Sequence, residues 1–296
     1  MRILIIGADN FVGRPLLEAL TRSDWAKPLG AAETASFEQA VEMADSIVNC
    51  TIGRPADITE AARKVFSAAK RLSRPPPVVH LGSMTVYGSA SGAVDERAPL
   101  LADTGAYAQA QLAADQLAGQ YPQAIRLRTG VEYGPGCQQW SGLIADCLAQ
   151  GRLGDLGAGG DGICNLLFID DLVAAILASL RQPQLQGQAF NLAVAAPPTW
   201  NEYFIAFAKA LGTVPVRRIS RRWLSIETKY LAAPLKVSQM LKLPLPPPIT
   251  PSLVAACRQE IRLDSCAAEV QLGLQWTGWE EGLQRAAAWW KADRRR

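Results

Sequence analysis

Short apolar runs alternate with stretches of helical periodicity over the first two-thirds of this 296-residue sequence. The apolar runs predict buried strands at 2–6, 46–51, 77–81, 124–128, 166–169 and 189–192. The amphipathic stretches between them predict helices at 11–21, 37–43, 58–71, 107–120 and 171–180. Strands that alternate with helices in this way are typical of an α/β fold built on a parallel sheet.

The pattern loosens after about residue 195. Residues 214–252 combine a basic cluster with an apolar, proline-rich run, KLPLPPPITP, and the cluster consists of Arg217, Arg218, Arg221 and Arg222. Such a cluster ordinarily forms a solvated face, but beside apolar sequence it is also compatible with contact to a membrane surface.

The amino-acid composition excludes some kinds of functional site but does not identify the function. Hydrophobic residues make up 49% of the chain and charged residues 19%, which supplies enough apolar material for a sizeable core. The formal net charge of +3 gives no reason to expect a nucleic-acid partner, and we expect none. The one histidine, His80, excludes a multi-histidine zinc site, so no metal centre is predicted.

The cysteines and the apolar segments indicate a cellular compartment. The six cysteines are widely spaced and include no C-x-x-C pair, which favours free thiols in a reducing environment. The N-terminus lacks a signal-peptide pattern, and Asp170 and Asp171 interrupt the longest apolar stretch, 166–180. We therefore expect a cytoplasmic protein with no integral membrane segment.

A glycine turn follows the first predicted strand and opens the first predicted helix. Its sequence is GADNFVG, residues 7–13. Backbone N–H groups at a helix N-terminus can hold a pyrophosphate, so the turn is a candidate dinucleotide site. Glycines at such a position also serve simply to turn a strand into a helix, and both interpretations are open.

Five later segments follow the order and spacing of a known family. They are HLGSMTVYG at 80–88, YAQAQ at 107–111, RLRTGVEYGPG at 126–136, LFIDDL at 167–172 and QAFNL at 188–192. Together with the glycine turn, they resemble the extended short-chain dehydrogenase/reductase superfamily, in its NAD-dependent epimerase/dehydratase group. The resemblance covers nearly the whole chain.

The resemblance implies an architecture and its ligands. A Rossmann-type parallel sheet that binds NAD or NADP would comprise residues 1–135 together with about 165–195. A smaller C-terminal substrate-binding domain would comprise about 136–164 together with 196–296. The expected partners are a small-molecule substrate and a second copy of the chain, with the helix after Tyr107 available for a homodimer.

The resemblance also assigns site residues by position. Tyr107 matches the tyrosine that transfers a proton, Ser83 matches the hydroxyl that polarises the substrate, and Gln111 occupies the position that holds the cofactor ribose. The residues expected to contact the cofactor are Gly7, Asn10, Phe11, Gly13, Asn49 and Thr51. Those expected to contact the substrate are Thr85, Tyr133, Cys137 and Trp140. His80 should point away from Ser83, because strand positions three apart face opposite sides.

One departure from the family concerns the tyrosine. The family pattern Tyr-x-x-x-Lys ends here in Gln111, which can hydrogen-bond a ribose but carries no charge. A tyrosine with an ordinary pKa of ~10 is only ~0.1% ionised at neutral pH. A neutral tyrosine can still donate a proton, so we expect ketone reduction to survive this change better than alcohol oxidation.

Two further departures concern the nucleotide. Asn10 replaces the middle glycine of the turn, and a carboxylate from the preceding Asp9 would cap the helix where a phosphate binds. Residues 23–33 make a poor strand, so one strand–helix element is expected to be missing on the adenosine side. Glu33 could contact a ribose, although a solvated loop charge is the simpler interpretation.

Three functions remain open at this point. The first is an NAD(P)-dependent oxidoreductase or epimerase that acts on a fairly apolar carbonyl or hydroxyl substrate. The second is an isomerase, lyase or cyclase that moves protons with Tyr107 and Ser83 and uses no nicotinamide cofactor. The third is a non-catalytic binding or sensor protein on the same fold.

Overall fold

Five of the six predicted apolar runs, together with a short strand that was not predicted, pair into one parallel sheet. The computed structural model describes residues 1–29, 36–214, 216–231, 233–235 and 248–294. The sheet has the order β2-β1-β3-β4-β6-β9. Its strands are β1 (Arg2–Ile6), β2 (Lys27–Pro28), β3 (Ser46–Asn49), β4 (Val78–Ser83), β6 (Ala124–Thr129) and β9 (Ala189–Leu192). The predicted α/β class with a Rossmann-type sheet is confirmed.

The edge of the sheet beside β1 is short, as the sequence predicts. β2 has only two residues there and pairs with β1 through Arg2 and Ile3. Residues 23–33 therefore contain this minimal strand rather than none. The helix α2 (Phe37–Met43) comes before β3, which pairs with the other side of β1. Glu33 lies outside the described residues.

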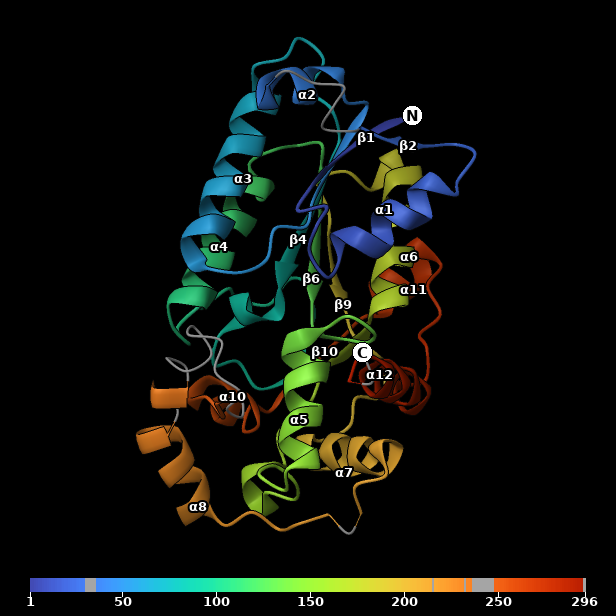
Figure 1. Ribbon diagram of the computed structural model, residues 1–296. Helices are drawn as coiled ribbons and strands as arrows, with labels where there is room; N and C mark the ends of the chain where they lie inside the picture. The colour runs from blue at the N-terminus through green and yellow to red at the C-terminus, as the bar shows by residue number, and fades with distance from the viewer. Residues whose placement is uncertain (30–35, 215, 232, 236–247, 295–296) are drawn as a thin grey trace.

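Helices cover both faces of the sheet (Figure 1). On one face lie α2, α3 (Pro55–Lys70) and α4 (Ala106–Gly119). On the other face lie α1 (Gly13–Thr21), α6 (Ile169–Arg181) and α11 (Cys266–Leu272). Each covering layer has its own apolar cluster, because the strands are buried on both sides.

The remaining elements gather beyond the carboxyl ends of the strands. Two small parallel sheets pair β5 (Gly92–Val94) with β10 (Ile261–Leu263) and β7 (Val131–Tyr133) with β8 (Leu166–Phe168). The helices are α5 (Leu143–Ala149), α7 (Trp200–Leu211), α8 (Arg221–Ile226), α10 (Pro251–Ala256) and α12 (Trp279–Asp293). Short helical turns at this end are η2 (Met84–Tyr87), η3 (Gln138–Gly142), η4 (Gly157–Gly159) and η6 (Glu227–Leu231). A further turn, η5 (Pro183–Leu185), lies at the amino ends of the strands, before β9.

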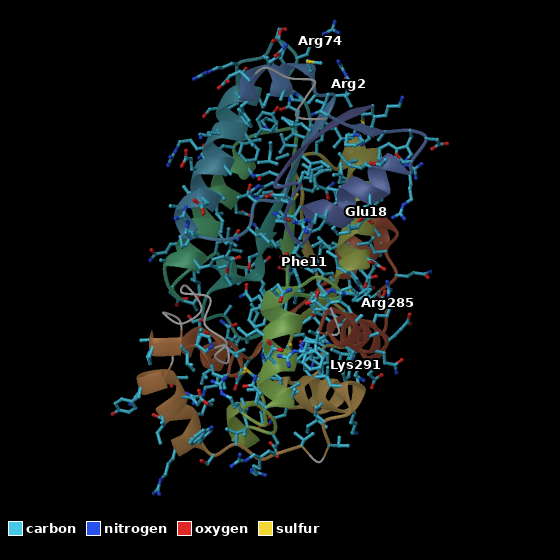
Figure 2. All side chains as sticks on the ribbon, viewed as in Figure 1. Arg2, Phe11, Glu18, Arg74, Arg285 and Lys291 are labelled. Atoms are coloured by element: carbon cyan, nitrogen blue, oxygen red, sulfur yellow. The ribbon has the colours of Figure 1, made fainter. Side chains whose placement is uncertain are left out.

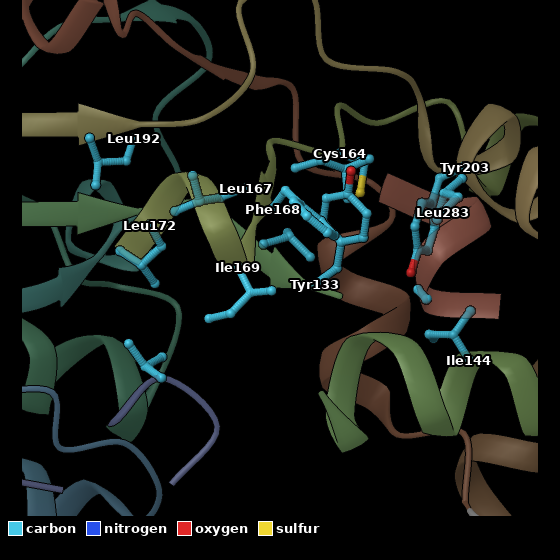
Figure 3. Close-up of a cluster of buried hydrophobic side chains, with 14 of the residues drawn as sticks. Tyr133, Ile144, Cys164, Leu167, Phe168, Ile169, Leu172, Leu192, Tyr203 and Leu283 are labelled. Atoms are coloured by element: carbon cyan, nitrogen blue, oxygen red, sulfur yellow. The ribbon is translucent and has the colours of Figure 1, made fainter. Parts of the chain in front are cut away.

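One hydrophobic cluster joins the sheet to these C-terminal helices. It includes Leu172 and Leu192 beside the sheet, and Tyr203 and Leu283 on α7 and α12 (Figure 3). The two domains expected from the sequence therefore share a core, and their boundaries stay a prediction. No helix of the described chain combines the length and apolarity needed to span a bilayer.

Candidate active site

Helix α4 brings a tyrosine, a glutamine and an aspartate to one face. Tyr107, Gln111 and Asp115 are spaced four residues apart, which places them along one side of a helix. The buried Asp115 carboxylate accepts two hydrogen bonds of 3.0 Å from the Arg128 guanidinium on β6. This paired geometry fixes the helix against the sheet and so sets the position of the other two residues.

The Tyr107 phenol lies between the two other predicted catalytic residues. Gln111 Nε2 donates a 3.0 Å hydrogen bond to the Tyr107 hydroxyl, and the Ser83 hydroxyl also hydrogen-bonds it. Tyr107 is 40% exposed, so a substrate can approach it. The structure thus brings together the three residues to which the family resemblance assigned catalysis.

The Tyr107 phenol is held in its protonated form. Burial raises its pKa above the ordinary 10.0, and the negative charge of Glu132 raises it further. The hydrogen bonds from Gln111 and Ser83 act in the opposite direction without reversing the shift. At neutral pH the group is therefore a proton donor.

The second polar atom of the Gln111 side chain is a hydrogen-bond acceptor without a donor among the described residues. Its side chain is 3% exposed, and its Oε1 has no hydrogen-bond partner in the described structure. A buried acceptor without a partner is costly, so this oxygen is suited to a donor brought by a ligand.

Glu132 is a member of the site that sequence reasoning missed. It lies on β7, and its side chain hydrogen-bonds Thr129. Thr129 on β6 is the neighbour of Ser83 on β4 in the register of the sheet. Burial raises the pKa of Glu132 to about 7. Burial also raises the pKa of Cys137, and the charge of Glu132 adds to that shift. The available signal was a charged residue between two apolar strand positions, which is unusual in a buried parallel strand.

The glycine turn closes on itself through Asn10. Asn10 Oδ1 accepts hydrogen bonds of 2.9 Å from the backbone N–H groups of Val12 and Gly13. Asn10 Nδ2 donates to the Cys50 carbonyl at 2.7 Å. Gly7 has a φ of +86°, and a Cβ on Gly13 would lie only 2.0 Å from the Gly7 carbonyl oxygen, so both positions require glycine.

Asp9 does not cap the helix, and that expectation is wrong. Its side chain is exposed, while its carbonyl accepts a 2.7 Å hydrogen bond from Arg14 Nε. Asn10 takes the capping position because the turn directs it inward. Phe11 lies just before α1, above α5 in the view of Figure 2, and a Cβ on Gly136 would be 3.7 Å from its ring.

Two of the other residues expected to contact the cofactor lie at the end of β3. Asn49 is buried, and its Oδ1 accepts hydrogen bonds from the backbone and hydroxyl of Thr51. Its Nδ2 lies 3.2 Å from His80 Nδ1. His80 also makes an edge contact with Phe66, under α3, and burial lowers its pKa to about 4. Its ring therefore packs against α3 and is neutral, and its orientation away from Ser83 stays a prediction.

The four residues expected to contact substrate do not form one group. The Thr85 hydroxyl donates to Ser83 Oγ at 3.1 Å, beside the Tyr107 cluster. The Cys137 thiol donates a hydrogen bond of 3.3 Å to the Glu132 carbonyl. Tyr133 packs on Phe168 in the core (Figure 3), and Trp140 packs on Trp200. Their roles stay predictions. In the part of the chain described, no three acidic, cysteine or histidine side chains are grouped as a metal site.

A family model matches more than half of the chain. The NAD dependent epimerase/dehydratase family matches residues 31–193, which contain the Ser83–Tyr107–Gln111 cluster. The chain belongs to this family. The matched residues begin after the glycine turn, the segment that departs from the family pattern. None of the curated proteins is similar to the chain in sequence.

Solved structures of the same fold cover the full length of the chain. UDP-glucuronic acid 4-epimerase from Bacillus cereus, in complex with NAD, has a TM-score of 0.75 at 15% identity, covering 99% of both chains. dTDP-glucose 4,6-dehydratase from Bacillus anthracis, also with NAD, has a TM-score of 0.75 at 16% identity, covering 100% of this chain and 98% of that one. RMD from Pseudomonas aeruginosa, complexed with NADPH, has a TM-score of 0.71 at 15% identity, covering 98% and 99%. At these identities the likeness shows the fold.

Within the described structure, the Tyr107 end of the site has a free group for a dinucleotide, whereas the groups at the glycine turn are already hydrogen-bonded. At the Tyr107 end, the unpartnered Gln111 Oε1 is the acceptor that a ribose hydroxyl needs. At the glycine turn, the N–H groups of Val12 and Gly13 are donors that a pyrophosphate would use, but Asn10 already occupies them. The residues present therefore accommodate a nicotinamide dinucleotide if the Asn10 side chain turns away.

Proposed function

We propose that the protein is an NAD(P)-dependent oxidoreductase or epimerase that works best in the direction of carbonyl reduction. The observation that carries this proposal is the Tyr107 phenol, which is protonated and hydrogen-bonded to both Ser83 and Gln111. Family membership and the NAD- and NADPH-bound relatives support a nicotinamide cofactor.

Each residue of the cluster has a defined task in this proposal. A bound nicotinamide supplies or accepts a hydride. Tyr107 donates its proton to the carbonyl oxygen of the substrate, and the Ser83 hydroxyl donates a hydrogen bond to the same oxygen. Gln111 holds the phenol through Nε2 and accepts a ribose hydroxyl through Oε1.

The protonation state gives the reaction a preferred direction. Reduction consumes the proton that Tyr107 already carries, whereas oxidation needs a phenolate to accept one. No cation stabilises that phenolate through Gln111, and the charge of Glu132 disfavours it. Reduction is therefore less affected than oxidation by the loss of the family's lysine.

The substrate class in this proposal is a fairly apolar carbonyl compound. Two apolar side chains support this class, Phe11 within the glycine turn and Trp140 on η3, and both are half-buried against the main hydrophobic cluster. The solved relatives include enzymes whose complexes hold UDP-glucuronic acid or UDP-glucose, so a nucleotide sugar is the alternative substrate class.

Non-redox proton transfer is the second candidate function. It is favoured by the Asn10 side chain, which occupies the donors a pyrophosphate needs, and by Glu132, a second titratable group near Tyr107. An isomerase, lyase or cyclase would use these two groups as acid and base without a nicotinamide.

Titration of the purified protein with NADH and NADPH separates the two candidates. By calorimetry, we expect one of them to bind with a Kd below about 1 mM. Absence of binding by both at millimolar concentration would remove the oxidoreductase proposal. Replacement Tyr107→Phe should then leave cofactor binding intact and abolish turnover of a panel of apolar ketones, each followed by loss of NAD(P)H absorbance.

The variant Gln111→Lys tests the direction of the chemistry. An ammonium group beside Tyr107 should lower the pKa of the phenol by about 1–3 units and raise oxidation more than reduction. Gln116→Lys, an exposed position on the same helix, is the matched control and should change neither rate. An equal effect of Gln111→Lys on both directions would contradict the role assigned to this position.

A further inference from the structure

An exposed face of mixed aromatic, aliphatic and basic side chains lies at the end of the molecule far from β2. The helix α8 runs directly into η6, and together they span residues 221–231. The α8 face, as we call it, consists of Arg222, Trp223, Ile226, Lys229 and Tyr230. In Figure 1, α8 lies at the lower edge of the molecule, outside α10 and α5.

The apolar side chains of this face are unusually exposed. Trp223 is 43% exposed, Ile226 44% and Tyr230 71%, although each would gain from burial. Their spacing of three and four residues places them along one side of the helix. Isolated exposed hydrophobic residues are common, but an aligned set of this kind marks a contact surface.

The opposite side of the same helix is firmly attached to the protein. Leu224 is buried in the main hydrophobic cluster. Glu227 is also buried and accepts hydrogen bonds of 2.7 and 3.0 Å from the Arg152 guanidinium. The helix begins with a cap in which Ser220 Oγ accepts the Trp223 N–H. The α8 face is therefore exposed although the helix that carries it is packed against the rest of the protein.

The segment that contains this face is mainly positively charged. Residues 217–230 contain five Lys and Arg residues, and their one acidic residue is Glu227, which the ion pair with Arg152 uses. Arg222 and Lys229 are exposed and directly precede Trp223 and Tyr230 in the sequence. Arg218 forms an ion pair with Asp155 at 3.4 Å, so it is not part of this excess, to which the α8 face contributes Arg222 and Lys229.

We infer that the α8 face binds the surface of an anionic phospholipid bilayer. Tryptophan and tyrosine prefer the boundary between headgroups and acyl chains, and Lys and Arg reach from there to the lipid phosphates. A helix with this composition lies in the plane of the interface. The chain would bind peripherally, with the helix parallel to the membrane.

This property is separate from the proposed reaction. Residues 221–231 lie outside the part of the chain that matches the family, 31–193. The net charge of the whole chain is only +3, so a general electrostatic attraction does not explain selective binding through this face. Membrane binding should therefore depend on these residues and not on cofactor binding or turnover.

Vesicle co-sedimentation tests the inference. The protein should bind phosphatidylcholine vesicles that contain phosphatidylglycerol at least tenfold more tightly than pure phosphatidylcholine vesicles, and high salt should weaken the binding. The variants R222E/K229E and W223S/I226S/Y230S should each lose at least tenfold in partitioning. Quenching of tryptophan fluorescence by brominated lipid should decrease in Trp223→Phe while binding persists.

A matched charge reversal controls for non-specific attraction. Arg63 and Lys70 are exposed on α3 with the same seven-residue spacing as Arg222 and Lys229, and no exposed aromatic side chain accompanies them. R63E/K70E should bind anionic vesicles like the unmodified protein. Circular dichroism verifies that each variant is folded.

Three results would overturn the inference. They are failure to bind anionic vesicles, equal loss of binding in R63E/K70E and R222E/K229E, and unchanged binding in the W223S/I226S/Y230S variant. Sedimentation velocity distinguishes a second occupant: if the apolar variant converts a dimer to a monomer and vesicle binding is absent, the face is an interface between two copies of the chain.

Discussion

Asn10 makes three hydrogen bonds that a bound pyrophosphate would have to displace. Two of them satisfy helix N–H groups, and the third ties the turn to Cys50 at the end of β3. Release of such a cap costs about 1 kcal/mol, which subtracts from the binding free energy of any dinucleotide. The sequence therefore predicts the turn correctly, but only the structure shows which side chain fills it.

Replacement of Asn10 by glycine should strengthen dinucleotide binding. We expect Asn10→Gly to lower the Kd for NADH or NADPH by about fivefold to tenfold, because the helix donors become available to phosphate. Asp9→Gly is the control, since it removes the neighbouring charge and leaves the three hydrogen bonds in place. Calorimetric titration measures both variants, and an unchanged Kd in Asn10→Gly, with cofactor still bound, would refute the competition.

Glu132 should make stability depend on pH near neutrality. Its pKa is about 7 in the folded protein against 4.5 as a free side chain, so folding disfavours its charged form. Its effect on stability is absent below about pH 4.5 and becomes increasingly unfavourable as the pH rises toward 7. We expect Glu132→Gln to be more stable than the unmodified protein by about 1–3 kcal/mol at pH 8 and equal to it at pH 4.5.

Urea unfolding at the two pH values measures this difference. Glu280→Gln, at an exposed position on α12, is the control and should show no pH-dependent gain. A gain of the same size at both pH values would mean that packing, and not the titration of Glu132, is responsible. Sequence reasoning overlooked Glu132 because the burial that raises its pKa comes from elements distant in sequence.

At the scale of elements, α4 is held by a buried ion pair between Asp115 and Arg128, to which Arg126 adds a second contact at 3.3 Å. Asp115 and Arg128 are both almost fully buried, and the ion pair with Arg128 holds the pKa of Asp115 below its ordinary value although burial alone would raise it. The loss of one partner leaves an uncompensated buried charge. Since Gln111 and Tyr107 lie about one and two turns before Asp115, the same pair positions the catalytic face.

The variant Asp115→Asn should therefore destabilise the fold by about 3–5 kcal/mol. Asp57→Asn on α3 breaks an exposed Asp–Arg pair with Arg54 and should cost much less, because water screens this pair. Chemical denaturation compares the two variants. Similar costs would show that the buried pair contributes no more than a surface pair, and α4 would then be held by apolar packing alone.

The sequence predicts the central strands well because they are buried on both faces. The strands at 2–6 and 189–192 have the predicted ends, and the central sheet contains five of the six predicted runs. The sixth, β8, pairs instead with β7 in a separate small sheet. The pairing of β5 with β10 was not predictable, because each has three residues and their partners are distant in sequence. Such short strands carry too little pattern to reveal their register.

At the scale of the whole molecule, the two predicted domains should unfold together. The main hydrophobic cluster contains Ile3 and Val12 beside the sheet as well as Phe207 and Ala286 on α7 and α12. α12 also packs against α7 and β8, so the C-terminal helices have no separate core among the described residues. A shared core of this kind makes unfolding cooperative.

Thermal unfolding followed by two signals tests this cooperativity. Near-ultraviolet circular dichroism reports mainly on the tryptophans, seven of which lie between residues 140 and 290, whereas far-ultraviolet circular dichroism reports on all helices. We expect the two midpoints to coincide. Substitution Ala286→Gly, at a buried position on α12, should lower both midpoints by the same amount, because the cost of a cavity in a shared core falls on the whole molecule. A lower midpoint in the near-ultraviolet signal alone would show that the C-terminal helices unfold as an independent unit.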